Sequence, residues 1–126
     1  MRAVDTNVLL RLITRDDVKQ ARAADEFAAT GAWVSHLVLI EAVRVLEAVY
    51  RLTRDNIAVA VEMLLDHASL SIQDSDVVAA ALIRSRRRLA PDFSDCLILE
   101  LARKTGNLPL GTFDRALGKL EGAERL

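Results

Sequence analysis

The stretch that decides the fold is Met1-Arg2-Ala3-Val4-Asp5-Thr6-Asn7, in which a short apolar run stops on an acid. A helical pattern of apolar residues follows directly at positions 8–13. If residues 2–4 form a buried strand, Asp5 lies at the carboxyl end of that strand and just ahead of a helix. Ligands of open α/β sheets bind at this edge. The carboxylate therefore either caps the helix or binds a cationic ligand, and the two interpretations imply different functions.

The rest of the chain alternates between strand and helix patterns. Strands are predicted at residues 2–4, 32–35, 70–72 and 108–113, with the tail 123–126 as a further candidate strand. Helices are predicted at residues 6–14, 16–30, 37–51, 54–68, 74–88 and 92–104, followed by a short helix that begins at Asp114. Such alternation predicts an α/β fold in three layers, with a short central parallel sheet flanked by helices. The length of 126 residues favours a single domain over residues 1–126.

Composition narrows the class of protein. A single cysteine, Cys96, excludes an internal disulfide and favours a reducing, cytoplasmic compartment. No apolar run approaches the roughly 20 residues of a membrane span, so no membrane association is expected. The net charge of −1 does not indicate a nucleic-acid binder. However, if four of the 18 acids shared one site, the remaining surface would be mildly basic, so charge leaves this question open.

Four acids are candidates for chemistry. Asp5 and Asp114 each follow a predicted strand and precede a helix, and an N-cap role explains either of them in isolation. Glu41 lies at the boundary between the apolar and polar faces of its helix. Asp95 falls in the apolar sector of its helix, beside Ile98, where a carboxylate must be paired, bound to a metal or neutralised.

The four acids together suggest a metal site. Two carboxylates about 5 Å apart repel by roughly 3 kcal/mol at an effective dielectric of 20, so a cluster would persist only around cations. Ligation by oxygen alone suits Mg²⁺ or Mn²⁺. Such ions polarise phosphoryl oxygens and stabilise leaving oxygens, which points to phosphodiester hydrolysis.

Four motifs resemble those of PIN-domain ribonucleases, and in particular the VapC toxins of toxin–antitoxin pairs. The motifs are Asp5-Thr6-Asn7, Ser35 followed by Val38-Leu39-Ile40-Glu41, Asp92-Phe93-Ser94-Asp95-Cys96-Leu97-Ile98, and Thr112-Phe113-Asp114. The resemblance covers essentially the whole chain. It implies that Asp5, Glu41 and Asp95 are metal-binding catalytic acids and that Asp114 is a weaker fourth. It also implies supporting polar roles for Thr6, Asn7, Ser35, Thr112 and Asp92, the last of which a helix cap explains equally well.

The same resemblance implies partners. The expected protein is a Mg²⁺- or Mn²⁺-dependent endoribonuclease that inhibits growth and works as a homodimer. A VapB-like antitoxin would hold it inactive by laying a segment near the acids, giving a heterotetramer or a larger complex. Several basic residues are candidate RNA contacts beside the site, although a solvated helix end also explains most of them: Arg84, Arg86, Arg87, Arg88, Arg11 and Arg15.

Three other interpretations remain. One is a catalytically silent PIN-like module that only binds partners. A phosphoacceptor receiver domain would need an acid such as Asp55 at a strand end, whereas Asp55 is predicted between two helices. A phosphatase of the haloacid-dehalogenase type would need an acid where Asn7 stands.

Overall fold

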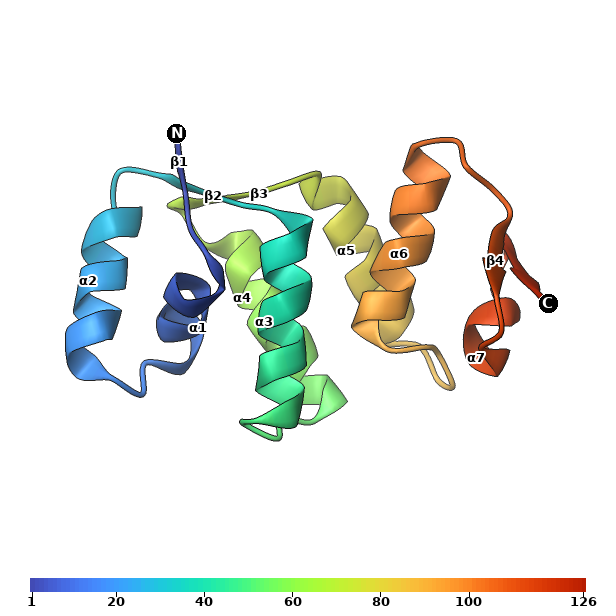
Figure 1. Cartoon of the computed structure of the whole chain (residues 1–126), viewed down its shortest axis with the longest axis horizontal. Coiled ribbons are helices and arrows are strands. Elements are labelled where there is room, and N and C mark those ends of the chain that lie inside the picture. The colour runs from blue at the N-terminus through green and yellow to red at the C-terminus, as the bar shows by residue number, and fades with distance from the viewer. The chain divides into compact units, whose positions relative to one another are not determined.

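A computed structural model describes residues 1–126. The chain divides into two compact units, Met1–Ser75 and Asp76–Leu126. Figure 1 labels the elements along the chain. Those of the first unit are β1 (Arg2–Ala3), α1 (Thr6–Thr14), α2 (Val18–Ala28), β2 (Ala32–Val34), α3 (His36–Ala48), α4 (Arg54–Asp66) and β3 (Leu70–Ile72).

The first unit is built on a three-stranded parallel sheet with the order β1-β2-β3. Arg2 pairs with Ala32, and Ala32 pairs with Leu70 on its other side. Because all three strands run in the same direction, their carboxyl ends share one edge of the sheet. Asp5, Ser35 and Gln73 follow these strand ends within two residues.

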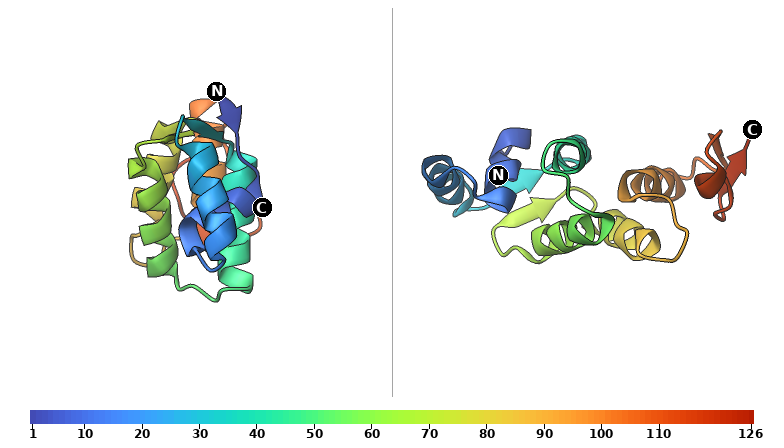
Figure 2. Two further views of the ribbon diagram at one scale, coloured as in Figure 1. Left: turned by 90° about the vertical axis from the view of Figure 1, so that its left-hand side faces the viewer. Right: turned by 90° about the horizontal axis from the view of Figure 1, so that it is seen from below.

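Helices pack around this sheet through small and branched apolar side chains. α1 contacts both α2 and α3, α4 contacts β3, and α3 and α4 lie side by side in Figures 1 and 2. Leu9 on α1, Leu39 and Leu46 on α3 and Val61 on α4 are among the fully buried side chains. At about 25 cal/mol per Å² of apolar surface, such burial is the main stabilising term of the unit.

The second unit contains α5 (Ser75–Ser85) from its second residue on, followed by α6 (Phe93–Lys104), β4 (Leu110–Thr112), α7 (Arg115–Gly118) and β5 (Ala123–Arg125). β4 and β5 form a two-stranded parallel sheet, and α7 packs beside both strands. Val78, Cys96 and Leu99 are fully buried in this unit. None of the chain's helices has the length and apolar character that a membrane span requires.

The predicted fold class is confirmed, because seven helices accompany short parallel strands. Several local predictions are wrong, among them the end of α3, which is Ala48 rather than residue 51. β1 is an edge strand with exposed residues rather than a buried strand, and only Val4 behind it is buried. α5 ends at Ser85 rather than at residue 88. Continuing α5 would place Arg84 and Arg88 four residues apart on one face, where like charges repel.

Candidate functional site

Asp5 is the N-cap of α1. Its Oδ1 accepts a hydrogen bond of 3.1 Å from the Val8 amide, and its backbone is extended. A carboxylate at this position is favoured by the helix dipole and by the unpaired amides of the first turn. The cap uses one oxygen, and the Asp5 residue is exposed. Its other oxygen, Oδ2, is therefore available to a ligand.

Thr6 connects the start of α1 to Glu41 on α3. The Thr6 hydroxyl donates to Glu41 Oε2 at 3.0 Å. Thr6, which follows Asp5 directly, thereby contacts a second candidate acid 35 residues further along the chain. Glu41 is exposed, and an exposed Glu inside a helix needs no partner for stability. The structure thus brings the predicted residues Asp5, Thr6 and Glu41 into one region of the first unit.

The other strand ends of this sheet edge hold polar groups. Ser35 caps α3 by accepting from the Val38 amide at 3.1 Å. Next to it, the buried His36 contacts Gln73 twice, through its amide to Gln73 Oε1 at 2.9 Å and through Nε2 to the Gln73 carbonyl at 2.6 Å. Because a carbonyl only accepts, His36 Nε2 carries the proton and the buried Nδ1 is left without a partner. Gln73 is not among the residues predicted from the sequence, and only its position directly after β3 would have indicated it.

A pocket of about 410 Å³ opens beside Asp5, between α1 and α2. Its lining comprises Asp5, Asn7, Val8, Arg11, Gln20, Ala23, Ala24 and Phe27. Asn7, predicted as a polar support, therefore lies on the pocket wall. A cavity of this size is within the range of roughly 300–1,000 Å³ that is typical of small-molecule sites.

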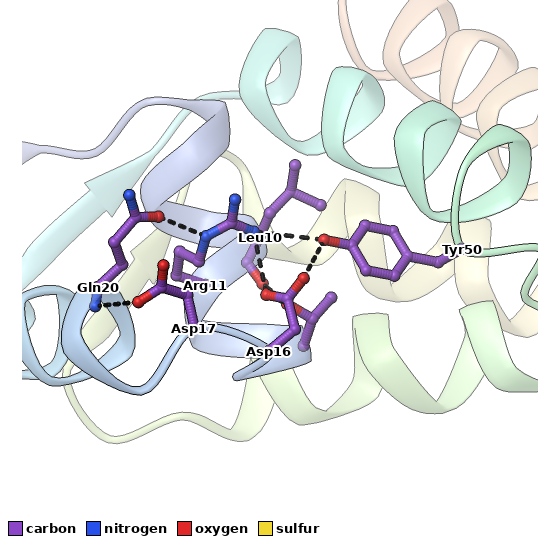
Figure 3. A network of polar contacts seen from close by, with 7 residues as sticks. Leu10, Arg11, Asp16, Asp17, Gln20 and Tyr50 are labelled. Atoms are coloured by element: carbon purple, nitrogen blue, oxygen red, sulfur yellow. Dashed lines mark hydrogen bonds and ion pairs between the residues drawn. The ribbon is translucent and has the colours of Figure 1, made fainter.

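Arg11, one of the residues that line the pocket, is held in a network of polar contacts (Figure 3). Its Nη1 contacts Asp16 at 3.1 Å and the Tyr50 hydroxyl at 3.3 Å, and its Nε donates to Gln20 Oε1 at 2.6 Å. Tyr50 in turn donates to Asp16 at 2.7 Å. The hydrogen bond with Tyr50 raises the pKa of Arg11, and the Tyr50 and Thr14 hydroxyls hold the pKa of Asp16 below its usual value. Arg11 is therefore a fixed cation whose Nε and Nη1 are already in use.

The second unit holds the other predicted residues in two local arrangements. Asp92 caps α6 by accepting from the Asp95 amide at 2.9 Å, which leaves Asp95 half-buried in the first helical turn. After β4, the Asp114 amide donates to the Thr112 hydroxyl at 3.0 Å. Asp114 Oδ2 accepts from the Leu117 amide at 2.8 Å, so it caps α7. Asp92 and Thr112 thus fix the backbone positions of the two candidate acids.

The candidate RNA-binding arginines differ in what they contact. Arg84 donates to Glu100 at 3.1 Å, and Arg15 forms a bidentate pair with Asp25 at 3.0 and 2.6 Å. Arg86, Arg87 and Arg88 are exposed in the turns that follow α5. RNA contact stays a prediction for all of them.

The donor set fits a hard divalent cation. Each candidate acid offers carboxylate oxygens, and Asp5, Glu41 and Asp114 commit one of their two oxygens to a hydrogen bond given above. Oxygen ligands with solvent access suit Mg²⁺ or Mn²⁺. Within neither unit do three or more His, Cys, Asp or Glu side chains form a group that could hold a metal. Asp5 and Glu41 belong to the first unit, and Asp95 and Asp114 to the second.

The family model of the PIN domain matches residues 2–123. No curated protein matches the chain. Because the family match covers nearly the whole sequence, the chain belongs to the PIN-domain family. PIN domains are generally nucleases, are often toxins, and typically use divalent metal ions. The assignment favours neither a receiver domain nor a phosphatase, and Asp55 lies exposed in the first turn of α4 rather than at a strand end.

Proposed function

We propose that this chain is a Mg²⁺- or Mn²⁺-dependent endoribonuclease and the toxin of a VapBC-type pair. The observation that carries the proposal is the arrangement at the end of β1. There, Asp5 is held by its cap while the adjacent Thr6 donates to Glu41. This arrangement occurs in a chain that matches the PIN domain from residue 2 to residue 123. The match runs through both units, which supports treating residues 1–126 as one PIN domain.

Asp5, Glu41, Asp95 and Asp114 are the residues that would hold the ion. A divalent ion bound by these acids supplies Lewis acidity to the phosphoryl group and stabilises the leaving oxygen. The chain itself orients the acids. The Val8 amide fixes the rotation of Asp5, the Thr6 hydroxyl holds Glu41, and the Leu117 amide holds Asp114.

The decisive experiment separates the charge of Asp5 from its role as a cap. Asp5→Asn keeps a good N-cap because Asn and Asp cap equally well, but it removes the negative charge. We expect purified protein to cleave RNA with Mg²⁺ or Mn²⁺, and expect both EDTA and Asp5→Asn to abolish cleavage.

Asp55→Asn is the matched control, because Asp55 is also an acid at the start of a helix. It should cleave RNA at the rate of the unsubstituted protein. Cleavage that persists in EDTA, or that Asp5→Asn leaves intact, would refute the metal mechanism. Acetyl-phosphate labelling lost in Asp55→Asn would instead revive the receiver interpretation.

The proposal extends to partners. Expression without an antitoxin should arrest growth, and co-expression of a VapB-like antitoxin should restore it. Light scattering after gel filtration should give the mass of a homodimer for the chain alone, and of a heterotetramer or larger with the antitoxin. A chain that binds an antitoxin but cleaves no RNA under any metal condition would be the catalytically silent module.

A further inference from the structure

The pocket between α1 and α2 is lined by both polar and apolar side chains. On α2 its lining residues recur at the spacing of one helical face: Gln20, Ala23, Ala24 and Phe27. The two alanines leave room where larger side chains would close the gap between the helices. Phe27 supplies an aromatic wall, and its ring is held by the Arg2 guanidinium 3.8 Å from the ring centroid.

Gln20 presents its amide in one fixed orientation. Arg11 is a donor only, so the Gln20 atom 2.6 Å from Arg11 Nε must be the amide oxygen. Arg11 is itself held by Asp16 and Tyr50, as Figure 3 shows. The Gln20 backbone amide is also fixed, since it donates to Asp17 at 2.9 Å. The side-chain NH₂ of Gln20 is therefore a preorganised pair of donors on the pocket wall.

The position of the pocket indicates which ligand it takes. Asp5 belongs both to the proposed metal site and to the pocket wall. A group bound in the pocket therefore lies next to the phosphodiester that the metal site would cut. An aromatic wall with amide groups at its edge is the combination that stacks and reads single-stranded bases.

We propose that this pocket is a subsite for the RNA base next to the scissile phosphodiester, and that Gln20 selects the base. The inference rests on the proposed nuclease function and adds its specificity. Two N–H donors match base edges with carbonyl acceptors, so the subsite favours guanine or uracil over adenine. Arg11 is a positioning residue for Gln20, because its Nε holds the Gln20 amide oxygen in place.

Binding can be tested without cleavage. The probes are 2′-O-methyl trinucleotides that differ only in their central base, titrated in EDTA and followed by NMR of the Gln20 side-chain amide. We expect guanine or uracil to bind roughly tenfold more tightly than adenine, because a well-oriented pair of hydrogen bonds to a base edge discriminates between bases by a factor of that order. In Gln20→Ala the affinities for the different bases should fall within about twofold of one another.

A cleavage assay with Mn²⁺ and unmodified RNAs provides the second measurement. The kcat/KM ratio between bases should show the same preference and lose it in Gln20→Ala, whereas Arg11→Lys should weaken it. Lys19→Ala is the matched control, because Lys19 is exposed on α2 outside the pocket lining. Its ratio between bases should be unchanged, and melting curves should show that all variants are folded.

The outcomes distinguish this inference from the proposed function. Cleavage without base preference, or a preference that survives Gln20→Ala, would overturn the subsite and leave the nuclease intact. Base-dependent binding without cleavage would support the subsite and refute the nuclease. If Gln20→Ala weakened binding of an antitoxin segment but left base preference unchanged, the pocket would be a protein-binding site instead.

Discussion

Glu100 is a buried carboxylate whose loss should destabilise the second unit strongly. The residue is 8% exposed and lies between two guanidinium groups. Arg84 Nε is 3.1 Å from Oε1, and Arg103 Nε is 3.4 Å from Oε2. Arg103 also donates to the Glu121 carbonyl at 2.6 Å, so the cluster links α5, α6 and the loop before β5.

The expected loss of stability depends on how well the guanidinium groups of Arg84 and Arg103 are hydrated once Glu100 is removed. Removing one member of a buried ion pair costs about 3–5 kcal/mol, because a charge is left uncompensated. Here the side chains of Arg84 and Arg103 are 24% and 35% exposed, so both cations can recover part of their hydration. We therefore expect Glu100→Ala to lower the free energy of unfolding by about 2–3 kcal/mol. Glu100→Gln keeps the shape and one acceptor, and should cost about 1 kcal/mol.

Urea unfolding followed by far-UV circular dichroism measures both values. Trp33, the only tryptophan, provides a second probe by fluorescence, and coincident transitions would support the two-state treatment that these values require. Glu26→Ala is the control, because Glu26 is exposed on α2 and should change stability by no more than about 0.5 kcal/mol. A Glu100→Ala value no larger than that of Glu26→Ala would refute the argument from burial.

Three further predictions concern stability. The hydrogen bond from Tyr50 is the main cause that lowers the pKa of Asp16. The ionised Asp16 therefore stabilises the folded protein above the ordinary carboxyl pKa of about 3.9, and this stabilisation is lost as the pH falls through the lower pKa that Asp16 has in the folded state. Tyr50→Phe should therefore reduce the drop in urea midpoint between about pH 6 and about pH 3, and an unchanged drop would contradict this. Gly122 has φ +92°, and an added Cβ would lie 3.0 Å from a guanidinium nitrogen, whereas Gly106 has φ +76° and open space around it. In thermal unfolding, Gly122→Ala should lower the free energy of unfolding by about 1–3 kcal/mol, and by more than Gly106→Ala does. Equal losses in the two variants would show that the contact of the added Cβ with the guanidinium group costs nothing. Asp5→Ala should lower stability by about 1 kcal/mol by calorimetry while Asp5→Asn stays close to the unsubstituted protein, and a loss in both would mean that more than the cap is involved.

Local elements were predictable from sequence because their signals are local. The periodicity of apolar residues and the capping residues Asp17, Thr53, Asp92 and Asp114 mark the helix starts, and the structure shows each of these residues capping as a side-chain acceptor. Ser35, predicted as the last residue of a strand, also caps a helix. Helix ends were less predictable. The arginines after α5 are favoured near a helix C-terminus by the helix dipole, which suggests that the helix continues through them. Their mutual repulsion opposes that continuation, and the dipole alone does not show which effect is larger.

Burial on α6 could not be predicted from hydropathy. The apolar pattern predicts Ile98 on the buried side and Glu100 on the polar side, yet Ile98 is 47% exposed and Glu100 is 8% exposed. Glu100 is buried because Arg84, 16 residues earlier, compensates its charge. A helical projection contains no information about such a partner. The Thr6–Glu41 contact is equally non-local, which is why Glu41 had no decisive assignment from its own helix.

The cap and the metal-ligand interpretations of Asp5 support one another. A carboxylate has two oxygens, and the cap uses only Oδ1. The hydrogen bond from Val8 restricts rotation of the side chain, so the direction of Oδ2 is set before any ligand arrives. Preorganised ligands bind without losing rotamer entropy at the moment of binding. Thr6 restrains Glu41 in the same way, and the start of α7 restrains Asp114. The features that explain each acid structurally are therefore those that a metal site needs, and a cap by itself is no argument against catalysis.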